Sequence, residues 1–226
     1  MRKLYPLLSV LFLIYWGCEN YQDTTPTEVT LWGEVYSVEN TTELDLGHNG
    51  LTVSIPSEIG NLTNLTKLIL EGNQLSGSIP PEIWNMTNLT YLDLSGNNND
   101  LSNGLSGSIP PEIWNMTNLI SLNLSDNQLT GYIYSEIGNL TNLTELRLDY
   151  NQLTGSIPSE IVNLTNLEWL TLNNNQLTDT IPNKICNFDI NWSSSTYFRI
   201  FNNQLCPPYP SCIEDYVGEQ DTSDCP

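Results

Sequence analysis

One phrase recurs along most of the chain, and it constrains the fold more than any other feature. The phrase is Leu-x-Leu-x-x-Asn-x-Leu, and in most steps a new copy begins 24 residues after the last. The copies start at Leu44, Leu68, Leu92, Leu122, Leu146 and Leu170, with a divergent seventh copy at Phe198. Self-similarity at such a period predicts a solenoid, in which each repeat is one coil that packs only on its neighbours.

Apolar residues within one unit predict a coil with a single buried side. In the unit that begins at Leu68, Leu68 and Leu70 alternate as one face of a short strand. Further apolar side chains point inward from the rest of the coil: Leu75, Ile79, Ile83, Met86 and Leu89. One coil buries too little apolar surface to offset the entropy of ordering it, so stacking on neighbouring coils must supply the rest.

The unit from Leu68 reads LILEGNQLSGSIPPEIWNMTNLTY. It resembles the plant-type class of leucine-rich repeat, whose hallmark is Leu-x-Gly-x-Ile-Pro followed by an Ile-Gly-Asn-Leu-Thr-Asn-Leu return. The resemblance extends over residues 40 to about 212. It implies an α/β solenoid: a right-handed coil with a parallel sheet on the concave face and a convex side that is mostly irregular or 3-10 helical. We expect seven strands within residues 42–205, one for each copy of the phrase.

Three further features of the repeat have structural interpretations. An insertion at residues 98–103 lengthens one step to 30 residues and is expected to form a loop at one edge of the solenoid. The Asn of every copy carries donors and acceptors that can satisfy backbone groups of adjacent coils. Glycines such as Gly77 are expected to break the chain direction, whereas Val53, Tyr134 and Asp179 depart from this pattern.

The N-terminal segment is typical of an export signal and is not expected to belong to the solenoid. Residues 1–18 hold two basic residues, an apolar run too short to span a bilayer, and then Gly17-Cys18. The Gly-Cys end resembles the cleavage box of bacterial lipoproteins, which implies lipidation of Cys18; ordinary secretion is the alternative. Residues 19–28 are then a polar tether, and residues 29–41 an N-terminal cap with a capping strand that includes Trp32.

Four cysteines gather toward the C-terminal end of the chain: Cys186, Cys206, Cys212 and Cys225. An even set in an exported chain predicts two disulfides, and four cysteines allow three pairings. The sequence from 205 to 212 resembles the C-terminal cap of plant-type repeats, where closely spaced cysteines pair, and this resemblance favours Cys206–Cys212 with Cys186–Cys225. We expect residues 206–226 to form a Cys-rich cap with an acidic tail, and no metal site, because the one histidine, His48, lies far away.

Charge and motif content exclude several classes of function. The chain has 26 acidic and 6 basic residues, so binding to nucleic acid or to anionic membrane surfaces is not expected. The acidity is expected to keep the surface soluble and the chain monomeric. The sequence has no Gly-rich phosphate loop, kinase signature or nucleophile elbow, and we interpret His48 near Asp45 as an incidental pair. We therefore expect no catalytic activity and no cofactor.

The resemblance places ligand binding on the open, concave face of the repeat sheet. Aromatic residues and arginines gather toward its C-terminal half: Arg147, Tyr150, Trp169, Tyr197, Arg199 and Phe201. Exposed Trp, Tyr and Arg together are the composition of binding hot spots, so these six are the predicted site. The alternative interpretation is that Tyr and Trp occupy strand positions because of their β propensity, and that Phe201 belongs to the cap.

The sequence thus predicts a binding module that is exported to the cell surface or outer membrane, or else secreted. Its expected ligand is a protein or a polysaccharide held on the concave face, and the only membrane contact is the lipid anchor. The alternative is a structural or adhesive surface protein without a single specific ligand, in which the regular Thr- and Asn-rich faces matter more than any one patch of residues. Binding to ice is one form that this alternative role could take. A recognition module loses its partner through point changes on the concave face, whereas an adhesive surface tolerates them.

Overall fold

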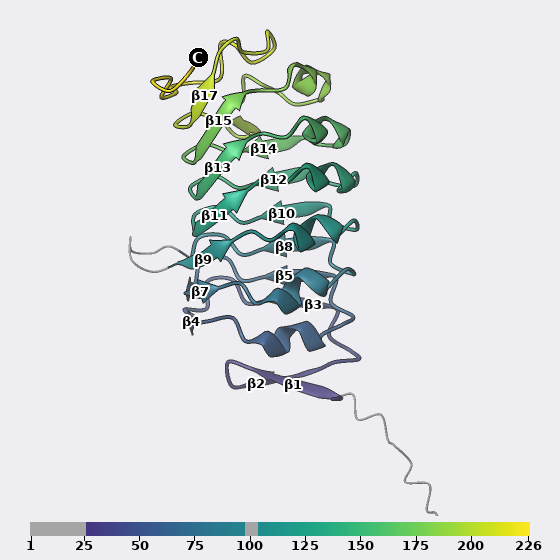
Figure 1. The fold of residues 1–226 in the computed structure, drawn as a ribbon. Coiled ribbons are helices and arrows are strands. Elements are labelled where there is room, and N and C mark those ends of the chain that lie inside the picture. Colours follow the sequence, from purple (N-terminus) through teal and green to yellow (C-terminus); the bar gives the residue numbers. More distant parts are fainter. Residues whose placement is uncertain (1–25, 98–103) are drawn as a thin grey trace, which may run out of the picture.

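The computed structural model describes residues 26–97 and 104–226 as one stack of coils (Figure 1). An N-terminal hairpin lies at one end of the stack and a Cys-rich cap at the other. The predicted export signal with Cys18, most of the tether and the insertion at 98–103 lie outside the described residues. Within the described part, no helix has the length and hydropathy needed to cross a membrane.

The first Leu of each unit lies in a parallel sheet that runs along the whole stack. The sheet has seven strands in sequence order: β3 (Glu43–Asp45), β5 (Lys67–Ile69), β8 (Tyr91–Asp93), β10 (Ser121–Asn123), β12 (Glu145–Arg147), β14 (Trp169–Thr171) and β16 (Phe198–Arg199). The register of the strands follows the sequence repeat, because Leu68 aligns with Leu44 on one side and with Leu92 on the other. The predicted fold class is confirmed, and this seven-stranded sheet is the concave sheet.

A second parallel sheet, which the sequence did not predict, forms where each coil turns away from the first. It has six strands: β7 (Gly77–Ser78), β9 (Leu105–Ser108), β11 (Gln128–Tyr132), β13 (Gln152–Ser156), β15 (Gln176–Thr180) and β17 (Gln204–Cys206). Two shorter strands, β4 (Thr52–Val53) and β6 (Gln74–Leu75), pair beside it. Val53 and Asp179 take the place of the repeat glycine with φ of 66° and 65°, a left-handed conformation that is strained for β-branched Val.

The third side of each coil is a single 3-10 turn, as the resemblance implies. These turns are η1 (Ser57–Asn61), η2 (Pro81–Asn85), η3 (Pro111–Asn115), η4 (Ser135–Asn139), η5 (Ser159–Asn163) and η6 (Asn183–Asn187). In all but η4, the residue before the turn is a proline, whose fixed φ holds the chain extended up to the point where the helix begins. In η4 this position is Tyr134, with a similar extended backbone.

The core is one continuous column of Leu and Ile inside the coils, and it also contains two tryptophans that the repeat pattern does not identify as core residues. Trp84 and Trp114 are buried between successive 3-10 turns. The equivalent position holds glycine in two other coils, at Gly60 and Gly138, and at Gly60 an added Cβ would lie 2.5 Å from the Cβ of Glu82 in the next coil. The distance between successive 3-10 turns therefore depends on the size of the residue at the position of Trp84 and Trp114.

The Asn column is structural, as predicted. The carboxamide of Asn151 accepts a hydrogen bond from the Leu129 backbone N–H and donates to the Leu124 carbonyl of the preceding coil. At the C-terminal end, Gln220 takes the same role, accepting from the Leu205 N–H and donating to the Ile200 carbonyl. In the cap, Gln220 thus forms the hydrogen bonds that the Asn of a further repeat would form.

The N-terminal cap is a hairpin, and the prediction of one capping strand was wrong. Strands β1 (Glu28–Leu31) and β2 (Glu34–Ser37) pair antiparallel around the two-residue turn Trp32-Gly33. Both turn residues have positive φ, at 48° and 91°, which matches the twist of a tight hairpin. The signal was present in the sequence as a Gly in the middle of the segment. The buried side chains of Val29 and Leu31 cover the first coil.

All four C-terminal cysteines form disulfides, but the pairing favoured by the resemblance was wrong. The bonds are Cys186–Cys212 and Cys206–Cys225, both with Cα atoms 5.6 Å apart. Three prolines, Pro207, Pro208 and Pro210, restrict the backbone after Cys206, so this segment crosses the end of the solenoid and brings Cys212 to η6. Each disulfide therefore ties the cap to a different part of the last coils.

Peptide mapping distinguishes the two pairings. Cleavage of the unreduced protein after Lys184, Arg199 and Glu214 is expected to leave the peptides that carry Cys186, Cys206 with Cys212, and Cys225 joined as one species. The pairing Cys206–Cys212 with Cys186–Cys225 would instead release the 200–214 peptide alone. Mass spectrometry before and after reduction checks the result, and the free 200–214 peptide would contradict the structure.

Candidate functional site

Three of the six predicted site residues form one stack across neighbouring strands of the concave sheet. The Arg147 guanidinium of β12 lies over the Trp169 ring of β14, 5.2 Å from its centroid. The Trp169 ring in turn meets the Tyr197 ring edge to face, with centroids 5.1 Å apart. The register of β12 and β14 aligns Glu145 with Trp169 and Arg147 with Thr171, so the Arg147 side chain reaches Trp169 diagonally across the two strands.

Arg199 and Tyr150, together with Arg147, line a shallow hollow of about 340 Å³ on the same face. Asp126 and Asp149 line it as well, so the hollow presents two guanidinium groups and two carboxylates. Partial burial raises the pKa of Asp126 above its usual value, and the neighbouring Asp149 carboxylate raises it further. A ligand group that enters this hollow meets both strong donors and strong acceptors.

Phe201 is the one predicted site residue that the structure places with the cap. It is half-buried against Gly218, where an added Cβ would lie 2.6 Å from the Phe201 Cβ. Its backbone carbonyl accepts a hydrogen bond from the Asn174 N–H. Phe201 therefore fits the alternative interpretation, in which it helps to close the end of the solenoid.

A row of buried polar side chains runs along the concave sheet, although the strand pattern predicts that these positions face solvent. The row comprises Asp93, Ser95, Asn123, Ser125, Asp149, Thr171 and Asn173. Asn123 donates to the Asp93 carboxylate at 3.0 Å, and Thr171 donates to Asp149. Side chains of adjacent strands cover one another here, which single-strand alternation cannot reveal.

Near the Arg147–Trp169–Tyr197 stack, several buried polar atoms have no hydrogen-bond partner in the described structure. Both side-chain polar atoms of Asn173 are buried and have no hydrogen-bond partner among the described residues. The same holds for Nε of Arg147 and for the indole nitrogen of Trp169. Buried polar groups are hydrogen-bonded in the great majority of cases, so unpaired ones beside a hollow need an explanation.

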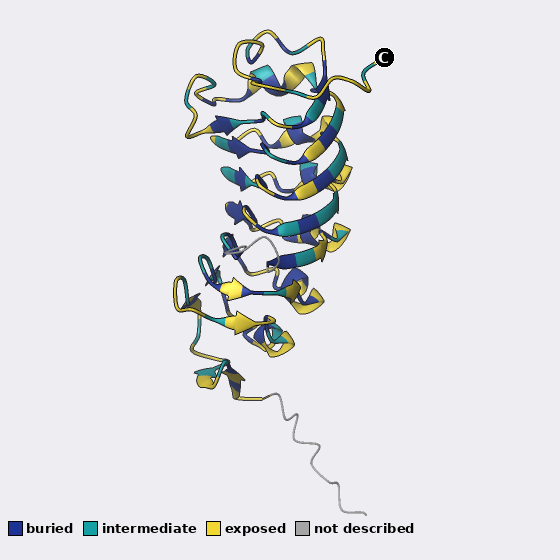
Figure 2. Cartoon of the chain, turned by 90° about the vertical axis from the view of Figure 1, so that its left-hand side faces the viewer, coloured by how far each residue is buried: buried dark blue, intermediate teal, exposed yellow. Residues whose placement is uncertain are grey.

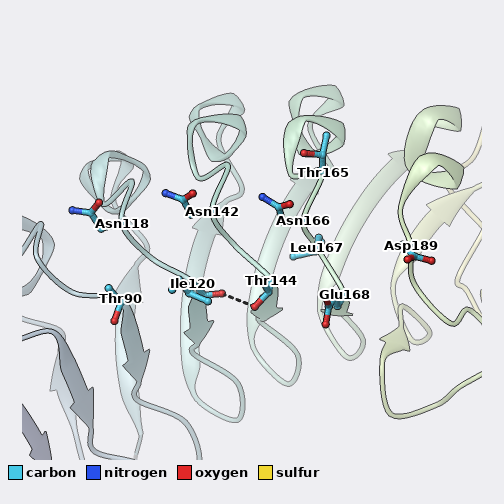
Figure 3. Close-up of a pocket in the computed structure, with 10 residues that line it drawn as sticks. All are labelled: Thr90, Asn118, Ile120, Asn142, Thr144, Thr165, Asn166, Leu167, Glu168 and Asp189. Atoms are coloured by element: carbon cyan, nitrogen blue, oxygen red, sulfur yellow. Dashed lines mark hydrogen bonds between the residues drawn. The ribbon is translucent and has the colours of Figure 1, made fainter.

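A larger hollow lies elsewhere, along the edge where the chain enters the concave strands (Figure 3). This lateral groove of about 640 Å³ contains Ile120, Thr144 and Glu168 and is crossed by a row of three asparagines. The asparagine amides are engaged, since Asn118, Asn142 and Asn166 each donate to a backbone carbonyl of the preceding coil at 2.8–2.9 Å. Size alone favours this groove, but its polar groups hold coils together, so we prefer the stack and the hollow beside it.

His48 and Asp45, interpreted from the sequence as an incidental pair, have different partners in the structure. Its Nε2 lies 3.5 Å from Oε1 of Glu71 in the next coil, and both side chains are exposed. Asp45 instead accepts a hydrogen bond from the Gly47 N–H. Within residues 26–97 and 104–226, no group of three or more His, Cys, Asp or Glu side chains has the arrangement of a metal site.

Family comparisons agree with this geometry. Two family models described as leucine-rich repeat match residues 39–98 and, in four successive segments, residues 88–116, 118–140, 142–164 and 166–188. The chain belongs to the leucine-rich-repeat family. No curated protein matches this leucine-rich-repeat chain.

Solved structures of other leucine-rich-repeat proteins are similar over most of the chain. A plant peptide hormone receptor, RGFR1 in complex with RGF2, is 40% identical with a TM-score of 0.64, over 73% of this chain and 25% of the receptor. The Arabidopsis receptor kinase HAESA, in complex with the peptide hormone IDA and the co-receptor SERK1, is 32% identical with a TM-score of 0.70, over 79% and 29%. A plant ice-binding protein is 29% identical with a TM-score of 0.55, over 76% and 51%. The chain therefore spans only about a quarter of the length of the first two proteins.

Proposed function

We propose that this chain is an exported binding module that recognises a protein or peptide ligand through the C-terminal half of its concave sheet. The observation that carries the proposal is the Arg147–Trp169–Tyr197 stack beside a hollow that holds a second arginine. Trp, Tyr and Arg are the residues that contribute most to protein interfaces. Holding them in one stack also lowers the entropy lost on binding, because their rotamers are already restricted.

The charges of the hollow favour a peptide over a simple ion. In a chain with a net charge of −20, two of the few arginines lie beside two aspartates. A polypeptide offers carbonyl oxygens and carboxylates to the arginines, and N–H groups to the aspartates, within a few ångströms.

The comparisons support a protein partner. One of the similar structures is a peptide hormone receptor in complex with RGF2, and another is a receptor kinase in complex with the peptide hormone IDA. The cell-surface assignment rests on the sequence and on the two disulfides, which are typical of an oxidising compartment. We propose that the Gly17-Cys18 pair anchors the mature chain through a lipid on Cys18, as its resemblance to bacterial lipoproteins implies.

Peptide display tests the proposal even though the natural ligand is unidentified. A random peptide library is selected on the purified protein, and the affinity of the enriched peptides is measured for the wild type and for Trp169→Ala and Arg147→Ala. A hot-spot contribution of about 2 kcal/mol predicts a loss of roughly 30-fold for Trp169→Ala. The matched control is Glu43→Ala, on the first strand of the same sheet, which should bind as the wild type does. Peptides that bind Trp169→Ala with unchanged affinity would refute the assignment of this patch.

A second candidate, contact with ice as part of a structural or adhesive role, is favoured by one observation. The similar structures include a plant ice-binding protein, and the outer face of the six-stranded sheet carries regular Ser and Thr side chains. Such a function would not depend on Trp169. Inhibition of ice recrystallisation by the wild type, undiminished in Trp169→Ala, is the result that would favour it over the concave site.

A further inference from the structure

One coil differs from the others on the outer face of the six-stranded sheet. Where neighbouring coils have Ser-Ile-Pro, at residues 78–80, 108–110 and 156–158, this coil has Tyr132-Ile133-Tyr134. The buried Ile is retained, so the coil keeps its core residue and changes only the two side chains that flank it. Tyr132 is 55% exposed and Tyr134 is 37% exposed, so both rings are accessible from solvent.

The two tyrosines form a fixed aromatic pair. Their ring centroids are 6.3 Å apart, with an interplanar angle of 81°. The Tyr132 ring packs against Gly155 of the next coil, where an added Cβ would lie only 2.7 Å from the ring atom Cδ1. The absence of a side chain at Gly155 therefore makes room for the Tyr132 ring. The ring is positioned by a strand of the next coil and not by a loop.

The surface around the pair is rich in hydroxyl groups and poor in charge. The repeat positions equivalent to Tyr132 hold the exposed residues Ser108, Ser156 and Thr180, one on each of three other strands. In the sheet register Tyr132 itself aligns with Thr154 of the next strand. Thr130, two residues before Tyr132, aligns with Ser108 of the preceding strand. In Figure 2, exposed and partly exposed positions of the sheet alternate with buried ones. Among the described strand residues of this sheet the charged one is Asp179 of β15, two strands away from Tyr132.

We propose that Tyr132 and Tyr134 anchor a second binding surface, whose ligand is a neutral polysaccharide. The C–H face of a pyranose ring is apolar and packs on an aromatic ring, while its hydroxyl groups lie around the rim and need polar partners. The serine and threonine hydroxyls beside the pair can both donate and accept hydrogen bonds with such a rim. Strands about 4.8 Å apart repeat these groups along the sheet, as a polymer repeats its sugar units.

The composition of this face distinguishes a polysaccharide from the other macromolecules. Ser is depleted in protein interfaces, and Ser and Thr are rare among their hot spots, so a protein would find few anchors beyond the two tyrosines. The strands of this sheet contain no Lys or Arg in their described residues, which disfavours an anionic polymer. A chain with a net charge of −20 that keeps this face nearly uncharged fits a partner without charge.

The test uses the residues that other coils carry. In the variant Tyr132→Ser with Tyr134→Pro, this coil regains the Ser-Ile-Pro of its neighbours, so the fold should be retained. Retention of the purified protein on amorphous cellulose, chitin and the soluble β-glucan laminarin is measured by depletion and affinity electrophoresis. We expect the wild type to bind at least one of these polymers and the double variant to bind it at least 10-fold more weakly. The matched control is Tyr216→Ser, which removes from the cap a tyrosine whose exposure, 44%, lies between those of Tyr132 and Tyr134, and should bind as the wild type does.

Two results would overturn the proposal. One is no retention of the wild type on any of the three neutral polymers, including the case in which the protein affects ice growth alone. The other is equal retention of the wild type and the double variant, once circular dichroism has shown that both are folded. Because Trp169 and Arg147 are intact in every variant, peptide binding on the concave sheet reports separately on the function proposed above.

Discussion

Replacing Asn151 by Ala is expected to lower the free energy of unfolding by about 3 kcal/mol or more, since two or more buried backbone groups lose their partner. Asn151 accepts a hydrogen bond from the Leu129 N–H at 2.9 Å and donates to the carbonyls of Leu124, Leu148 and Asp149 at 2.9–3.2 Å. These groups lie where the chain leaves one sheet, so no strand partner replaces the carboxamide. Urea unfolding followed by circular dichroism measures the loss.

The control for this prediction lies in the 3-10 turn before it. Asn139 is exposed at the end of η4, so Asn139→Ala should change the free energy of unfolding by no more than about 0.5 kcal/mol. A similar, small effect of both substitutions would show that water replaces the Asn151 carboxamide at little cost. In that case the column would be a consequence of the repeat and not a source of its stability.

The features that depend on one coil and its nearest neighbour could be predicted from the sequence. The repeat phase places Leu44, Leu68 and Leu92 in one register, and the concave sheet follows directly. The contact between Trp169 and Tyr197 follows as well, since both residues directly precede the first apolar residue of their repeat units, whereas Arg147 reaches Trp169 diagonally from two residues further along its strand. Asn was predicted to join coils because its amide is the group that can accept and donate at once.

Features set by the curvature of the stack or by single exceptions could not be predicted in this way. The burial of Asp93 and Asn123 on the concave sheet depends on how closely neighbouring side chains approach, which the alternation of one strand does not contain. The pairing of Cys186 with Cys212 depends on the path of a proline-rich segment across the end of the solenoid. The N-terminal hairpin was missed because Gly33 was assigned to a continuous strand, although a Gly there favours a turn.

The substitution Trp114→Ala is expected to lower the free energy of unfolding by roughly 3–5 kcal/mol, because it empties a fully buried volume between η3 and η4. Trp114 has no exposed surface, and the coils on either side cannot close the gap without breaking the register of both sheets. Ala is nevertheless closer in size to the glycines that occupy this position in other coils. A loss of stability on replacement by Ala would thus show that the distance between η3 and η4 is matched to the size of Trp114.

Trp114→Phe separates the packing of the indole from its polar group. The Trp114 indole N–H is buried without a hydrogen-bond partner in the described structure, so a Phe that fills most of the same volume also removes an unsatisfied donor. We expect it to cost less than about 1.5 kcal/mol, well below the cost of Ala. The exposed residue Glu112 of η3 provides the control, because Glu112→Ala should leave stability within about 0.5 kcal/mol of the wild type. Equal losses for Ala and Phe would instead assign the role of Trp114 to its indole nitrogen, and packing between the turns would no longer explain why this coil carries a tryptophan.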